Sequence, residues 1–369
     1  MSVIQKTSND LNPITDVSVR AQHVAPLQPT LVHITSSTWV MIGILALLAV
    51  AFIPISMVLG VTYDYTLIVV AMGGVLLGVL SGVLGSFAVL RRQSLLGDAL
   101  SHAALPGVCV AFLFFGRDIG ALLIGAGISS LLGVGFIRLL THTTRIKQDA
   151  AMGIILASWF ALGVALLTYI QSLENASQAG LDKFIFGQAA AIRLSDVILV
   201  AIVGAICLLV LVIFWKELKL MTFDLEFAQA NGYPVRFLDA ILSLLVVVAI
   251  VLGLQLAGVI LMVGLLIAPG VAARQWTRGM IQMLVLAGIF GGFAGGAGAV
   301  VSALDKNLPT GALIIVVATG LVFLSICFAP ERGLIWSWRK RRSDVKRFAG
   351  MVSGELYSLP KSQHEEGVS

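Results

Sequence analysis

The sequence predicts an all-α, polytopic membrane protein with about nine to ten transmembrane helices. Long apolar runs recur from Trp39 to Phe328, and a helix needs roughly 20 apolar residues to cross a bilayer. Charged residues make up 12% of the chain, half of the ~25% that is usual in soluble domains. The mean hydropathy is +1.00. These three observations exclude a soluble globular fold.

The apolar runs fall in order along the chain. They lie at residues 39–59, 66–90, 97–115, 119–140, 150–170, 194–214, 237–271, 279–303 and 310–328. The run at 237–271 is too long for one upright crossing and contains the glycines Gly253 and Gly258. It fits one tilted helix, two short crossings, or a helix broken near Gln255.

The distribution of Lys and Arg favours two crossings at 237–271. Basic residues mark three connections on one side of the membrane, at 91–92, 138–147 and 216–236, and such residues concentrate in the cytoplasm. Two crossings at 237–271 place the basic stretch after Trp338 on that side as well. We therefore expect roughly ten crossings of the inner, cytoplasmic membrane, with both termini in the cytoplasm.

This pattern predicts three regions: a polar cytoplasmic tail at 1–38, a transmembrane domain at 39–330 and a basic cytoplasmic tail at 331–369. The formal net charge of +5 would point to nucleic acid in a soluble protein. Here the positive residues lie in loops and in the C-terminal tail, where they set the topology and contact anionic lipid. Membrane lipid is therefore the expected partner of these charges, and nucleic acid is not.

The apolar runs are rich in glycine, as in Gly73–Gly85 and Gly288–Gly298. Small residues four apart let the backbones of neighbouring helices approach closely in lipid. The pattern favours simple helix packing, and a set of helices that slide as a gate opens remains the alternative.

Two ionisable groups open the run at 97–115. Asp98 and His102 are four residues apart, which places them on one face of a helix. Pro106 lies one turn further on and has no N–H, so the carbonyl of His102 loses its helical partner, while Gly107 permits close packing. Ionisable groups at membrane depth are costly and usually line a pathway or a site. The alternative is that Asp98 is an N-cap that accepts from the amide of Ser101.

A site made of a carboxylate, an imidazole and a carbonyl oxygen mixes oxygen and nitrogen donors. Such a set suits Mn²⁺, Fe²⁺ or Zn²⁺ better than Na⁺ or Ca²⁺. Two side chains are too few for a tight structural site, so we expect weak binding of a metal in transit.

The longest polar connection between spans is 216–236. It predicts a short amphipathic helix at the membrane surface, with Phe223, Phe227 and Ala230 on one face. Its other positions include Asp224, Glu226 and Gln229. An acidic helix is repelled by anionic lipid, so a protein partner is favoured over a connector lying on lipid. Asn231 and Gly232 predict the end of this helix.

The stretch "LRRQSLLGDALSHAALPGVCVAF" resembles the signature of the permease subunits of metal-ion ABC importers. Three further stretches resemble the same family, and the resemblance spans about 66–336 in the right order. They are Phe223–Leu242, Leu256–Trp276, in which Gly270 replaces the usual alanine, and Leu308–Trp336.

The resemblance implies a type II ABC importer-like permease for a divalent metal (manganese, zinc or iron), with Asp98 and His102 in the metal pathway. It also implies an ATP-binding partner subunit that docks on 216–236, where Phe223, Asp224, Glu226, Phe227 and Gly232 are the expected contacts. An extracytoplasmic metal-binding protein and a second permease copy or paralogue complete the expected assembly.

The sequence contains no Gly-Lys dipeptide and hence no P-loop. We therefore expect ATP to bind to the partner subunit. We expect this chain to hold no permanent cofactor and not to be an enzyme. Two alternatives remain: a proton-coupled secondary transporter that works without an ATPase, and a membrane enzyme with an intramembrane metal.

Overall fold

The computed structural model describes residues 64–172, 192–305 and 308–329, together with the short pieces at 41–43, 46, 333 and 334. Apart from those short pieces, the predicted tails and the first apolar run lie outside the described residues.

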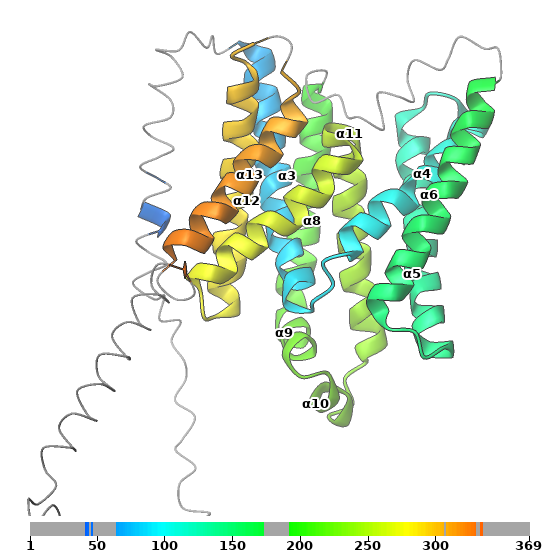
Figure 1. The fold of residues 1–369 in the computed structure, drawn as a ribbon, viewed down its shortest axis with the longest axis vertical. Helices are drawn as coiled ribbons and strands as arrows, with labels where there is room; N and C mark the ends of the chain where they lie inside the picture. The colour runs from blue at the N-terminus through cyan, green and yellow to red at the C-terminus, as the bar shows by residue number, and fades with distance from the viewer. Residues whose placement is uncertain are drawn as a thin grey trace, which may run out of the picture. The chain divides into compact units, whose positions relative to one another are not determined.

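All regular secondary structure in the described residues is helical (Figure 1). The helices are α3 (Tyr65–Leu90), α4 (Leu96–Phe115), α5 (Ile119–Thr143), α6 (Gln148–Ser172), α8 (Leu194–Ile213), α9 (Trp215–Phe223), α10 (Leu225–Ala230), α11 (Val235–Trp276), α12 (Met280–Ser302) and α13 (Thr310–Phe328). Eight helical segments within the described residues are long and apolar enough to cross a membrane. The predicted all-α, polytopic architecture is thereby confirmed.

Helix α11 is broken in its middle, at Gly258, whose backbone angles (φ 76°, ψ 173°) are not helical. A Cβ on Gly253 would overlap the sulfur of Met262. In a straight helix these two residues would lie about 13 Å apart along the axis, so the chain must turn back between them. Figure 1 shows the two halves of α11 running in opposite directions. The chain therefore turns back within α11, and the break lies at Gly258 rather than at Gln255. Among the described residues of α11, only Val235–Leu254 is long and apolar enough to count as a span, so the second crossing stays a prediction.

Helix α3 contacts α8, α11 and α12, and it meets α11 in the half that follows Gly258, where a Cβ on Gly85 would overlap the carbonyl of Leu266. Its glycines face the glycines of α12 so closely that a Cβ on Gly78 would overlap the carbonyl of Gly291, and a Cβ on Gly74 would lie 2.8 Å from the carbonyl oxygen of Gly295. The glycine-rich runs therefore do serve helix packing, as the sequence predicts. The sliding of these helices stays a prediction.

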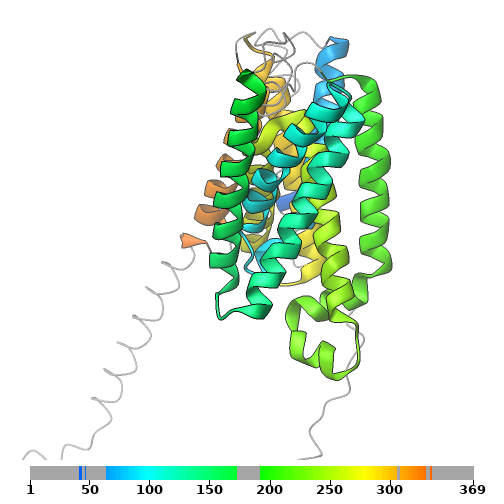
Figure 2. The same cartoon turned by 90° about the vertical axis from the view of Figure 1, so that its right-hand side faces the viewer.

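A second group of helices forms around α4, which packs against α5, α6 and α11. Helices α9 and α10 lie beyond the end of the long helices, as Figure 2 shows. The fold therefore separates two features that the sequence singles out: Asp98 and His102 lie within the bundle on α4, and the predicted docking segment projects from one end of it.

Candidate functional site

Asp98 and His102 face each other on α4. The Nε2 atom of His102 lies 3.3 Å from Oδ1 of Asp98, and their side chains are 25% and 35% exposed, respectively. The shared helical face predicted from the spacing is therefore present. Partial exposure leaves donor atoms of both side chains accessible from outside the packed core.

The N-cap interpretation of Asp98 is wrong. Helix α4 begins at Leu96 with Leu95 as its N-cap, and no side chain caps it. The amide of Ala99 already bonds to the carbonyl of Leu95, so Asp98 is inside the first helical turn. The sequence does not indicate that α4 begins at Leu96, because Leu95 has no side chain that could cap a helix. A tight turn precedes the helix instead.

Helix α6 borders the pair on one side. The ring of Phe160 meets the imidazole of His102 edge-on, with 4.8 Å between ring centroids and an interplanar angle of 75°. This contact fixes one side of the imidazole against an apolar surface. Phe160 was not predicted, because nothing local to α6 distinguishes it from other apolar residues.

The stretch of α4 around Pro106 is held by serines of α5. The hydroxyl of Ser129 donates to the carbonyl of Ala103 at 2.6 Å, and that of Ser130 donates to the carbonyl of Leu100 at 3.0 Å. These bonds support the helix where proline removes a backbone donor. Both serines were missed by sequence reasoning, since in a glycine-rich run they look like ordinary small packing residues.

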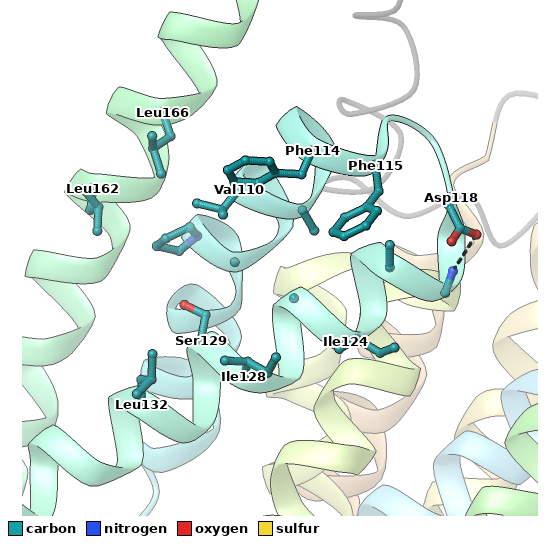
Figure 3. Close-up of a pocket in the computed structure, with 16 residues that line it drawn as sticks. Val110, Phe114, Phe115, Asp118, Ile124, Ile128, Ser129, Leu132, Leu162 and Leu166 are labelled. Carbon is teal, nitrogen blue, oxygen red and sulfur yellow. Dashed lines mark hydrogen bonds between the residues drawn. The ribbon is translucent and has the colours of Figure 1, made fainter.

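Gly107 allows α5 to pack directly on α4, because a Cβ on Gly107 would overlap the carbonyl oxygen of Gly125. Pro106 and Gly107 also line an apolar pocket of about 640 Å³ between α4, α5 and α6 (Figure 3). Asp98 and His102 are not among its lining residues. The pocket is walled mainly by apolar side chains such as Phe114 and Leu162, and Asp118 is the one charged residue in its lining.

The donor set of that pair is small. Within residues 64–172, 192–305 and 308–329, no group of three or more His, Cys, Asp or Glu side chains could hold a metal ion. A carboxylate and an imidazole alone fit weak, transient binding rather than a structural site. This finding also gives no support, within those residues, to an enzyme with a buried metal centre.

The segment at 216–236 folds differently from the single amphipathic helix that was predicted. It contains two short helices, α9 and α10, which meet at Asp224. The side chain of Asp224 caps α10, because its Oδ1 accepts from the amide of Phe227 at 2.9 Å. The single-helix prediction is wrong because this cap begins a new helix. Gly232 (φ 78°) ends the segment, as predicted.

Large apolar side chains of this segment are exposed: Phe223 at 63%, Leu225 at 45% and Phe227 at 54%. Glu226 lies between them in the first turn of α10. Large apolar side chains exposed together are typical of a surface that binds another protein or a membrane.

Comparison with known families matches residues 62–329 to "ABC 3 transport family". The chain belongs to the ABC 3 transport family. Within this family, it is 50% identical over 263 residues to the manganese transport system membrane protein MntC of Bacillus subtilis; the match covers 71% of this chain and 60% of that relative. It is 47% identical to the zinc transport system membrane protein TroC of Treponema pallidum, over 78% of this chain and 97% of the relative.

Among solved structures, PsaBC from Streptococcus pneumoniae in complex with Fab is similar, with a TM-score of 0.65 and 32% identity over 77% of this chain and 97% of the other. The resemblance of the sequence motifs to the membrane subunits of ABC transport systems is thereby confirmed.

Proposed function

We propose that this chain is the membrane-spanning subunit of an ATP-driven importer that moves manganese, zinc or iron as a divalent ion across the cytoplasmic membrane. The observation that carries the proposal is the Asp98–His102 pair, whose carboxylate and imidazole face each other on one helix. The relatives named for manganese and zinc transport support this class of substrate. Iron belongs to it because the same oxygen and nitrogen donors serve Fe²⁺.

In this proposal Asp98 and His102 touch the metal as it passes. Two side chains hold an ion weakly, which suits transit because the ion must also leave. A second permease copy facing the first would double the donors to two carboxylates and two imidazoles, so a dimer is the form in which the pathway is complete. Pro106 and Gly107 give α4 its shape beyond the pair, through the missing backbone donor and the contact with α5.

ATP hydrolysis belongs to a partner subunit that binds at α9 and α10. The exposed Phe223 and Phe227 supply the apolar part of that interface, and Glu226 supplies charge. Asp224 and Gly232 contribute by shaping the segment, as the cap and the stop of α10. A metal-binding protein on the opposite side of the membrane would deliver the ion.

The test is manganese uptake into liposomes that contain this chain with or without its ATPase. We expect uptake only with the ATPase and ATP, and we expect His102→Ala to abolish it without loss of the complex. Uptake by the chain alone, driven by a pH gradient, would instead establish the secondary transporter.

A further inference from the structure

A charged cluster outside the Asp98–His102 pair joins three helices. Asp239 of α11 places Oδ1 2.6 Å from Nη2 of Arg91 and Oδ2 2.6 Å from Nη2 of Arg138. Ser243, one turn along α11, accepts from Nη2 of Arg138 at 2.9 Å and donates to the backbone carbonyl of Asp239 at 2.8 Å. The side chains of Arg91, Arg138 and Asp239 are 16%, 33% and 26% exposed, so solvent screens the cluster only in part.

Asp239 lies directly after the proposed docking segment. Helix α10 ends at Ala230, Gly232 reverses the chain, and α11 begins at Val235. Asp239 is therefore in the second turn of the helix that leaves α10. Because only a few residues connect α10 to α11, a displacement of α10 would also move this end of α11.

Arg91 connects Asp239 to the beginning of α4. It directly follows α3 and opens the short turn at 91–95 that leads into α4. This turn is tight and internally bonded: Gln93 donates to the carbonyl of Ala88 at 2.8 Å, and Leu96 donates to that of Gln93 at 3.0 Å. Asp98 follows two residues after Leu96. Because this turn is short and internally hydrogen-bonded, a shift of Arg91 would also move Asp98.

Arg138 connects Asp239 to the middle of α4. It lies on α5, the helix whose Ser129 and Ser130 donate to carbonyls of α4 on either side of His102. A rigid α5 that moves with Arg138 therefore carries the His102 region of α4 with it. The single carboxylate of Asp239 is thus linked to both ends of the Asp98–His102 pair, through different helices.

The positions of Arg91 and Arg138 depend on the same carboxylate. One carboxylate holds two guanidinium groups, one on each oxygen, so withdrawing Asp239 leaves two positive groups facing each other. Arg91 and Arg138 then repel, and the ends of α3 and α5 no longer share a partner. Two discrete arrangements of packed elements are what a transmission step requires.

We propose that Asp239 is the coupling residue of this permease: through Arg91 and Arg138 it transmits movement of the α9–α10 segment to the Asp98–His102 pair. The inference rests on the proposed function, since it assigns a route between the proposed ATPase contact and the proposed metal pathway. Asp239 acts as a positioning residue, because it acts on the pair only through its partners.

The experiment compares metal uptake with ATP hydrolysis in liposomes that contain the permease and its ATPase, using manganese as the probe. Asp239→Asn keeps the shape of the side chain and removes its charge. We expect the manganese transported per ATP hydrolysed to fall by about tenfold, within the usual range for coupling between two sites, while hydrolysis itself persists. Asp239→Glu restores the carboxylate and should recover most of the ratio.

Asp118→Asn is the matched control. It makes the same chemical change at the N-cap of α5, where asparagine caps about as well as aspartate, and the ratio should not change. Should Asp239→Asn fail to assemble, Ser243→Ala tests the same cluster by removing one bond from Arg138, and it should lower the ratio in the same direction.

A normal ratio in Asp239→Asn would overturn the inference, whether uptake and hydrolysis are both unchanged or both fall in proportion, since a purely structural role predicts one or the other. Failure of the unaltered permease to take up manganese with ATP would count against the proposed function itself, so the two failures are distinguishable.

Discussion

The role of Asp98 can be separated from its effect on stability by the single substitution Asp98→Asn. Asparagine has nearly the same size and keeps a side-chain oxygen at the position of Asp98, but it carries no charge. Because Leu95 and not Asp98 is the N-cap, the substitution removes no cap bond. The substitution therefore affects stability only through the electrostatic interactions of the carboxylate.

The expected loss of stability is small. A carboxylate in the first turn of a helix is worth about 0.3–1 kcal/mol. The contact with His102 joins two partly exposed side chains, and such pairs contribute about 0–1 kcal/mol, only while the imidazole is protonated. A total near 1 kcal/mol corresponds to a decrease in melting temperature of about 2–4 °C for a chain with a few hundred ordered residues.

The expected loss of transport is much larger. Mutation of groups that merely orient metal ligands reduces metal affinity or activity by roughly 10–100-fold, so removing a ligand charge should reduce uptake by at least about tenfold. The assay measures uptake of radioactive manganese by permease and ATPase in liposomes, beside a fluorescence melting curve of the same preparation. Asp118→Asn again serves as the control.

Normal uptake by Asp98→Asn would refute the reasoning and remove Asp98 from the pathway. A melting temperature that falls by far more than a few degrees would also refute it, because the structure then misrepresents how little Asp98 contributes to the fold.

Three further outcomes follow from the geometry. Gly78→Ala should cost about 1–3 kcal/mol, because its Cβ meets backbone of α12, whereas Gly135→Ala, with open space around it, should be neutral or stabilising; melting curves of both check this, and equal effects would contradict it. Phe227→Ser should weaken co-purification of the ATPase by about tenfold with little change in melting temperature. The side chain is half-exposed in the permease alone, so it adds little to the stability of the fold, and it contributes more than about 1 kcal/mol of binding free energy once a partner covers it. Asp224→Asn should keep both the cap and ATPase binding, while Asp224→Ala should lose about 1 kcal/mol of local stability and impair binding; similar binding by the two variants would show that the cap is irrelevant.

Much of the candidate site was predictable because it depends on the local spacing of residues within one helix or turn. The spacing of Asp98 and His102 fixes their shared face in any helix, whichever neighbours it has. Gly232 ends α10 because a positive φ is easily adopted by glycine. The start of α4 was not predictable in this way, since its N-cap is a leucine whose side chain makes no capping bond. The division of 216–236 at Asp224 was missed because aspartate fits a helical polar face as well as a cap.

The sequence by itself determined which segments are long and apolar enough to cross a membrane, because hydropathy and length are properties of one segment at a time. Only the tertiary structure decided that α11 turns back at Gly258, that Ser129 and Ser130 support α4, and that Asp239 is shared by two arginines of other helices. Periodicity fixes the directions in which side chains leave a single helix. It does not specify which other helix lies there, because that depends on how the backbones pack, and here glycine-to-glycine contacts between distant segments set that packing.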